Sequence, residues 1–97
     1  MTAPHVSDVA ARIETFVREH FRVAGHDTRF SRRAPLFDLG YVDSVGVIEL
    51  LEFVNEQFGV RIPDEALLSD EFTTIDGMAV VIRRLLDDPA SRSPQRR

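Results

Sequence analysis

The sequence predicts an all-α fold: a small four-helix bundle with three longer helices, one short helix and a long first loop. Three segments repeat apolar residues at helical spacings of three and four, and no segment alternates apolar and polar residues as a half-buried strand does. A length of 97 residues, 43% of them hydrophobic, fits one domain with a modest core. We expect this domain at residues 1–88 and a disordered, proline-containing tail at residues 89–97.

The first helix is expected to begin near Val6 and to be closed by Gly25, because glycine is common directly after a helix end. Its apolar residues form one stripe: Val6, Val9, Ala10, Ile13, Phe16, Val17, Phe21 and Ala24. His20 falls on this stripe and is expected to be partly buried. Residues 25–43 show no helical pattern. Four apolar side chains are expected to pin this loop to the core: Phe30, Leu36, Phe37 and Leu39.

The second helix is expected from Ser44 to Phe58, closed by Gly59 in the left-handed conformation. Its core face comprises Val47, Leu50, Leu51, Val54 and Phe58. The opposite face carries an acidic stripe of Glu49, Glu52 and Glu56, flanked by Val45, Ile48 and Phe53. Apolar residues beside an acidic stripe are typical of a docking surface for a basic partner. An alternative is that these apolar side chains pack on the long loop. This alternative accounts for Ile48 and Phe53 as well as a docking surface does, and for Val45 less well.

Two further helices complete the predicted bundle. The segment from Pro63 to Leu68 has proline and acids where a first helical turn favours them, and it spans at most about two turns. The last helix is expected to begin at Thr73, with Asp76 in the capping-box position, and to end before Pro89. Gly77 is expected to weaken its first turn. Its inward residues are Ile75, Met78, Ala79, Ile82, Leu85 and Leu86.

Charge and composition argue against several functional classes. A net charge of -4 and a pI near 5.3 argue against nucleic-acid binding. Residues 38–76 hold ten acids and one arginine, which favours a basic partner, although a solvated surface gives the same pattern. No apolar run is long enough to span a membrane and no signal peptide is recognisable, so we expect a cytoplasmic protein. The absence of cysteine excludes disulfides, thiolate metal sites and cysteine nucleophiles.

Asp43 and Ser44 stand where the second helix begins. Both residue types are favoured there because their side chains accept hydrogen bonds from unpaired backbone N–H groups. A catalytic serine needs a base, and no histidine is close to Ser44 in the sequence, so a small hydrolase is the weakest interpretation. The histidines also lack metal-ligand spacing: His5, His20 and His26. We therefore expect no catalytic residue and no metal site.

The segment LFDLGYVDSVGVIELL, from Leu36 to Leu51, resembles the phosphopantetheine attachment region of acyl and peptidyl carrier proteins of the stand-alone type. Three later segments agree with that family in order and spacing: Phe58-Gly59-Val60, Ile62-Pro63 and Phe72-Thr73-Thr74-Ile75. The resemblance covers about residues 6–86 and implies a non-catalytic carrier domain. It also implies that Ser44, supported by Asp43, accepts 4′-phosphopantetheine from coenzyme A. The arm would then hold an acyl or aminoacyl group as a thioester.

The resemblance further implies three kinds of partner: a phosphopantetheinyl transferase, a loading ligase or transferase, and a downstream synthase or tailoring enzyme. The expected pathway makes a polyketide, a nonribosomal peptide or a related product. The expected docking residues are Val45, Ile48, Glu49, Glu52 and Glu56. Gly46 stands where many fatty-acid carriers have an acid, which is closer to carriers dedicated to one building block. The alternative is a carrier-like helical interaction module without cargo. A monomer is expected, since no large apolar face is spare.

Overall fold

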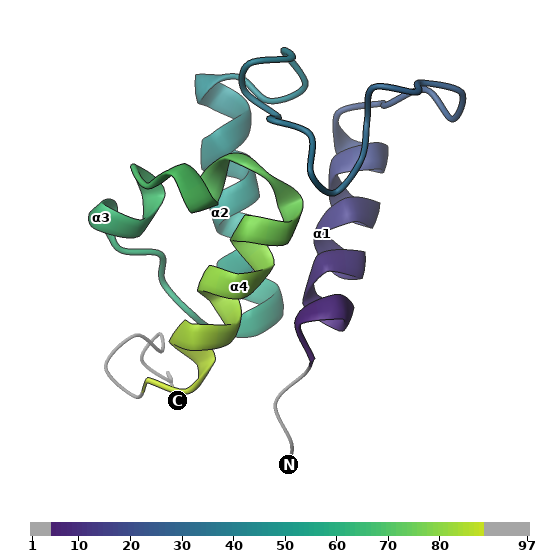
Figure 1. The fold of residues 1–97 in the computed structure, drawn as a ribbon. Coiled ribbons are helices and arrows are strands. Elements are labelled where there is room, and N and C mark those ends of the chain that lie inside the picture. The colour runs from purple at the N-terminus through teal and green to yellow at the C-terminus, as the bar shows by residue number, and fades with distance from the viewer. Residues whose placement is uncertain (1–4, 89–97) are drawn as a thin grey trace.

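The computed structural model describes residues 5–88, which form four α-helices and one turn of 3₁₀ helix (Figure 1). In chain order these are α1 (Val6–His20), α2 (Ser44–Phe58), α3 (Asp64–Leu67), the 3₁₀ helix η1 (Asp70–Thr73) and α4 (Ile75–Leu86). No strand occurs within residues 5–88. The predicted all-α fold of three longer helices, one short helix and a long first loop is confirmed. The tail expected at residues 89–97 lies outside the described residues.

The core forms where the apolar faces of the three longer helices meet. Fully buried side chains come from α1, α2, η1 and α4: Val9, Ile13, Val17, Leu50, Val54, Phe72, Ile75, Met78 and Ile82. No polar or charged residue is buried within the described part of the chain. Val47, Leu51 and Phe58 are partly buried against this core, as are Leu85 and Leu86. The apolar periodicity therefore predicted the inward faces of α2 and α4 correctly. In the first helix the prediction was wrong for Val6 and Ala24, which are exposed.

The end of α1 differs from the prediction. The helix stops at His20, five residues before Gly25, because Arg22 takes the left-handed conformation with φ of 56°. The N–H of Phe21 donates to the carbonyl of Val17, and the N–H of Val23 donates to that of Arg18. These bonds close the helix in the manner of a Schellman motif, with arginine where glycine is usual. A left-handed arginine gives no signal in the sequence, which is why the boundary was misplaced.

The start of α4 lies one residue later than expected, at the other threonine of the pair. The side chain of Thr74 accepts a hydrogen bond from the backbone N–H of Gly77 at 3.0 Å. Thr73 belongs to η1 instead, where its hydroxyl donates to the carbonyl of Asp70 at 2.7 Å. Asp76 lies two residues after the cap rather than three, so the predicted capping box is wrong.

Gly77 allows η1 to pack closely on α4. A Cβ atom on Gly77 would overlap the backbone carbonyl of Glu71, so a side chain at this position requires η1 to move. The sequence analysis considered only the weak helix propensity of Gly77. In the structure, glycine is the residue that permits this contact between backbones.

The long loop is fixed to the bundle at the end of η1 and at the start of α4. Two of the four expected side chains are buried and two are partly buried: Phe30, Leu36, Phe37 and Leu39. The backbone N–H of Leu36 donates to the carbonyl of Thr73 at 2.9 Å. The N–H of Asp76 donates to the carbonyl of Arg32, also at 2.9 Å. These two bonds fix the loop that leads into α2.

Glu14 ties the same loop to α1. Its carboxylate accepts hydrogen bonds from Arg32 Nε at 2.8 Å and from Arg18 Nε at 3.1 Å. The bond from Arg32, helped by Arg18, lowers the pKa of Glu14 below its usual value, and partial burial opposes this shift. The Arg18 guanidinium also lies 4.5 Å from the centre of the Phe30 ring. The loop is thus held against α1 by charge as well as by apolar contact.

Candidate functional site

Ser44 is the first residue of α2, and Asp43 caps the helix beside it. The Asp43 backbone is extended, and its carboxylate accepts a hydrogen bond from the N–H of Gly46 at 2.7 Å. Ser44 is exposed, and its hydroxyl makes no hydrogen bond within residues 5–88. Since Asp43 performs the capping, the Ser44 side chain is left accessible to another molecule. The structure thus separates the two roles that the sequence allowed for this pair.

The turn before Ser44 is rigidly held. Gly40 has a φ of 82°, a left-handed conformation that favours glycine. The N–H of Tyr41 donates to the carbonyl of Leu36 at 2.9 Å, and the side chain of Val42 is buried. These contacts fix the chain two residues before Ser44. The hydroxyl at the start of α2 is therefore presented from a fixed backbone.

Tyr41 braces this turn against the earlier part of the loop. Its hydroxyl donates to a carboxylate oxygen of Asp27 at 2.6 Å, and its ring meets that of Phe30 edge-on at 5.2 Å. The hydrogen bond lowers the pKa of Asp27 and raises the pKa of Tyr41. Both shifts follow from the stability of an anionic acceptor beside a neutral phenol donor.

The helix start suits an anion attached to Ser44. Backbone N–H groups at a helix N-terminus are unpaired, and the helix dipole places partial positive charge there. Within α2 the first turn contains no acidic residue, and the carboxylate of the preceding residue, Asp43, is engaged by the N–H of Gly46. A phosphate ester on the Ser44 oxygen would lie in this favourable field.

An open hollow follows Ser44 along α2. It has a volume of about 430 Å³ and is bounded by Ile48, Leu51, Glu52, Asn55 and Glu56. Ile48 and Leu51 lie four and seven residues after Ser44, so they share its side of the helix. The hollow therefore lies on the Ser44 side of α2.

The predicted docking residues occupy the exposed face of α2. Val45 is 65% exposed and Ile48 is 58% exposed, so neither packs on the long loop. All three acidic residues of the stripe are also at the surface: Glu49, Glu52 and Glu56. Phe53 differs, because its ring is partly buried and stacks on Phe16 of α1 at 4.2 Å. Its partner is therefore α1, which neither of the two interpretations in the sequence analysis named.

One contact between the acidic stripe and α1 was not predicted from the sequence. His20 Nε2 lies 2.9 Å from Glu49 Oε1, and the two residues are 29 positions apart in the chain. The His20 side chain is 40% exposed, so it lies nearer the surface than the apolar stripe suggested. The only signal for this contact was the position of His20 on the face of the first helix that turns toward the second.

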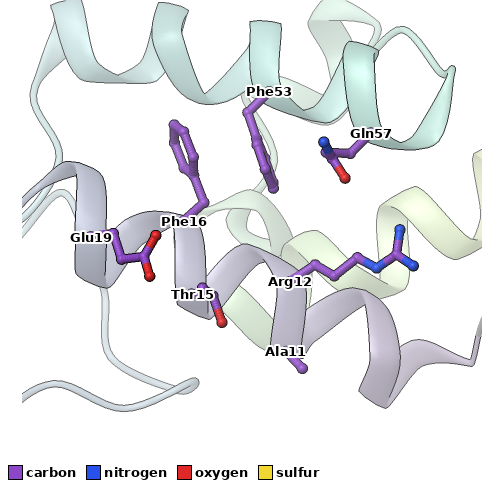
Figure 2. A pocket seen from close by; sticks show the side chains of 7 residues that line it. All are labelled: Ala11, Arg12, Thr15, Phe16, Glu19, Phe53 and Gln57. Carbon is purple, nitrogen blue, oxygen red and sulfur yellow. The ribbon is translucent and has the colours of Figure 1, made fainter.

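The seam between α1 and α2 also contains an open cleft of about 400 Å³ (Figure 2). Phe16 and Phe53 stand side by side within it, and Arg12 and Gln57 lie toward its other end. Ser44 does not line this cleft. Its remaining lining residues are Ala11, Thr15 and Glu19 of α1.

Neither a metal centre nor a membrane span is found in the part of the chain that the structure describes. No group of three histidine, cysteine or acidic side chains in residues 5–88 could hold a metal ion. No helix in the same range is long and apolar enough to cross a membrane. The histidine nearest the exposed face of α2, His20, is bonded to Glu49 and not to Ser44.

Comparison with known proteins gives concordant matches. Residues 11–82 match a family profile described as "Phosphopantetheine attachment site". The acyl carrier protein of Zymomonas mobilis subsp. mobilis is 42% identical over 62 residues, which are 64% of this chain and 77% of that protein. The probable acyl carrier protein PigG of a Serratia species is 28% identical over 65 residues, which are 67% of this chain and 75% of that protein.

Proposed function

The chain belongs to the acyl carrier proteins, a family of carriers that hold 4′-phosphopantetheine covalently, and we propose that Ser44 is its point of attachment here. One observation carries this proposal. Asp43 caps α2 through the N–H of Gly46, which leaves the exposed Ser44 hydroxyl with no hydrogen bond within residues 5–88. A serine required as the cap could not give up its hydroxyl to an ester without weakening the helix.

The proposed modification needs a separate enzyme. A phosphopantetheinyl transferase, acting with magnesium, joins the Ser44 oxygen to the phosphorus of coenzyme A that bears the pantetheine arm. The phosphoanhydride bond breaks, adenosine 3′,5′-bisphosphate leaves, and the hydroxyl proton of Ser44 is released. Asp43 keeps the first turn of α2 formed, and the helix N-terminus receives the phosphate charge. The arm supplies the thiol that this cysteine-free chain lacks, so that an acyl or aminoacyl group can be held as a thioester.

The carrier is proposed to dock its partner enzymes through the exposed face of α2. This surface comprises Val45, Ile48, Glu49, Glu52 and Glu56. The acids attract a basic patch, and the two aliphatic side chains offer apolar contact close to Ser44. Its partners are a transferase, a loading ligase or transferase, and a downstream synthase or tailoring enzyme. These act in a polyketide, nonribosomal-peptide or related pathway, a choice supported by the acid-free first turn of α2.

The protein is also proposed to be a cytoplasmic monomer, with residues 1–88 as its carrier domain. Coenzyme A and the enzymes that use it support that location. The large apolar side chains that are exposed among residues 5–88 are spread over α1, α2, α4 and the residue that follows α3: Val6, Val45, Ile48, Val80 and Leu68. Single apolar residues of this kind are common on monomer surfaces.

The proposal is tested by intact mass after incubation with coenzyme A, magnesium and a promiscuous phosphopantetheinyl transferase. The wild-type protein should gain one phosphopantetheine group, and Ser44→Ala should gain none. Ser7→Ala, at another exposed serine in the first turn of a helix, should be modified like the wild type. A folded wild-type protein that gains no mass would contradict the proposal and favour a helical interaction module without cargo.

A further inference from the structure

The imidazole of His20 is held in place by two aromatic rings, one in α1 and one directly after it. It stacks on Phe16 with ring centres 4.8 Å apart and an angle of 12° between the planes. Phe21 meets it edge-on at 5.0 Å, with an angle of 83°. Phe16 stacks in turn on Phe53 of α2, which ties this cluster of rings to the second helix. His20 is thus oriented toward α2 by its neighbours.

The oriented ring reaches one acid of the stripe and leaves two without such a bond. His20 Nε2 lies 2.9 Å from Glu49 Oε1. Within residues 5–88, neither Glu52 nor Glu56 makes a hydrogen bond or an ion pair. A shallow hollow of about 220 Å³ is bounded by these three acids, His20 and two phenylalanine rings. The three glutamates, which look equivalent in the sequence, therefore differ in the structure.

We propose that His20 is a positioning residue that holds Glu49 against α1 and leaves Glu52 and Glu56 to bind basic side chains of partner enzymes. One oxygen of the Glu49 carboxylate is already bonded to His20. A basic side chain of a partner enzyme that pairs with Glu49 must therefore displace the His20 imidazole or share this carboxylate with it. His20 on α1 therefore tunes the affinity of the carrier for its partner enzymes through Glu49, without contacting those enzymes itself. This inference rests on the proposed function, because it concerns the enzymes that act on Ser44.

Removal of the imidazole should increase the affinity of the carrier for a partner enzyme. His20→Phe keeps a ring that can stack on Phe16, but it cannot bond to Glu49. The freed carboxylate should lower the KM of the transferase about two- to fivefold, the effect of one exposed ion pair, with kcat unchanged. His20→Gln retains an N–H donor and should bring KM back toward the wild-type value.

A double-mutant cycle tests the inference directly. KM and kcat are measured with one phosphopantetheinyl transferase for wild type, His20→Phe, Glu49→Gln and the double variant. Glu49→Gln should raise KM more in the His20→Phe protein than in the wild type, by a further factor of about two to five. Glu65→Gln removes an acid from α3, outside the proposed surface, and controls for loss of net charge. Far-ultraviolet circular dichroism checks that each variant is folded.

Each other outcome overturns the inference. A higher or unchanged KM for folded His20→Phe would mean that His20 contacts the partner itself or does not engage Glu49. Equal effects of Glu49→Gln in both proteins would mean that the two side chains are not coupled. If the wild type is not modified at all, the proposed function fails as well. If it is modified but Glu52→Gln and Glu56→Gln leave KM unchanged, only the docking surface and this inference fail.

Discussion

Replacing Gly77 with alanine should destabilise the protein, although alanine is the better helix former. By helix propensity alone the change would stabilise α4 by about 1 kcal/mol. The added Cβ, however, would overlap the backbone carbonyl of Glu71 and lie 3.1 Å from its Cα. A backbone atom cannot rotate away as a side chain can, so η1 must shift. Overpacking costs about 1–3 kcal/mol, and a clash with backbone atoms places this site at the upper end of that range, about 2–3 kcal/mol.

The net expectation is a loss of about 1–2 kcal/mol in the free energy of unfolding. For a domain of this size that corresponds to a Tm lower by roughly 5–15 °C. Urea unfolding followed by far-ultraviolet circular dichroism measures the difference. Gly25→Ala is the matched control, because no atom lies within 4 Å of its added Cβ, and its effect should stay within about 0.5 kcal/mol. A Gly77→Ala protein more stable than the wild type would refute the close packing of η1 on α4.

Three further predictions follow from the caps and the Glu14 cluster. Asp43→Ala should lower the free energy of unfolding by about 1 kcal/mol, because α2 loses its cap. Ser44→Ala should change it by less than about 0.5 kcal/mol. Equal losses for the two variants in urea unfolding would make Ser44 a structural residue. Arg22→Gly should stabilise the fold by about 0.5–1 kcal/mol, since glycine adopts a φ of 56° without strain. A lower Tm for this variant would contradict the left-handed closure of α1. Hydrogen bonds from Arg32 and Arg18 lower the pKa of Glu14 in the folded state. The ionised Glu14 side chain therefore stabilises the fold by about 1 kcal/mol at a pH above 4.5, the usual pKa of glutamate in an unfolded chain. This stabilisation is lost as the pH falls below that value. Glu14→Gln should therefore lose less stability than the wild type between pH 6 and pH 3, and parallel pH profiles would contradict this ion pairing.

Local signals in the sequence defined α2 and its surroundings well. The start at Ser44 and the left-handed Gly59, with φ of 67°, were both predicted, because caps and glycine stops depend on neighbouring residues alone. The attachment segment was recognised for the same reason, since its residues are contiguous. The inward faces of the long helices also follow from periodicity within one element.

Features that depend on distant residues could not be predicted. The left-handed Arg22 ends α1 without a glycine, and the choice of Thr74 over Thr73 reflects the place of η1 beside α4. The pairing of His20 with Glu49 requires that α1 and α2 meet in a particular register. The role of Gly77 also depends on a distant residue. Its low helix propensity predicted a weak first turn of α4, whereas the close approach of the Glu71 backbone leaves room only for glycine.

The central claim, that Ser44 carries the arm, is tested most directly by locating the added mass within the chain. Cleavage by trypsin after Arg33 and Arg61 gives the peptide of residues 34–61, in which Ser44 is the only serine and no threonine occurs. After reaction with coenzyme A and a transferase, this peptide should carry the mass of one phosphopantetheine group, and every other peptide should keep its unmodified mass. The added group on a different peptide, or on none while the protein is folded, would contradict the account.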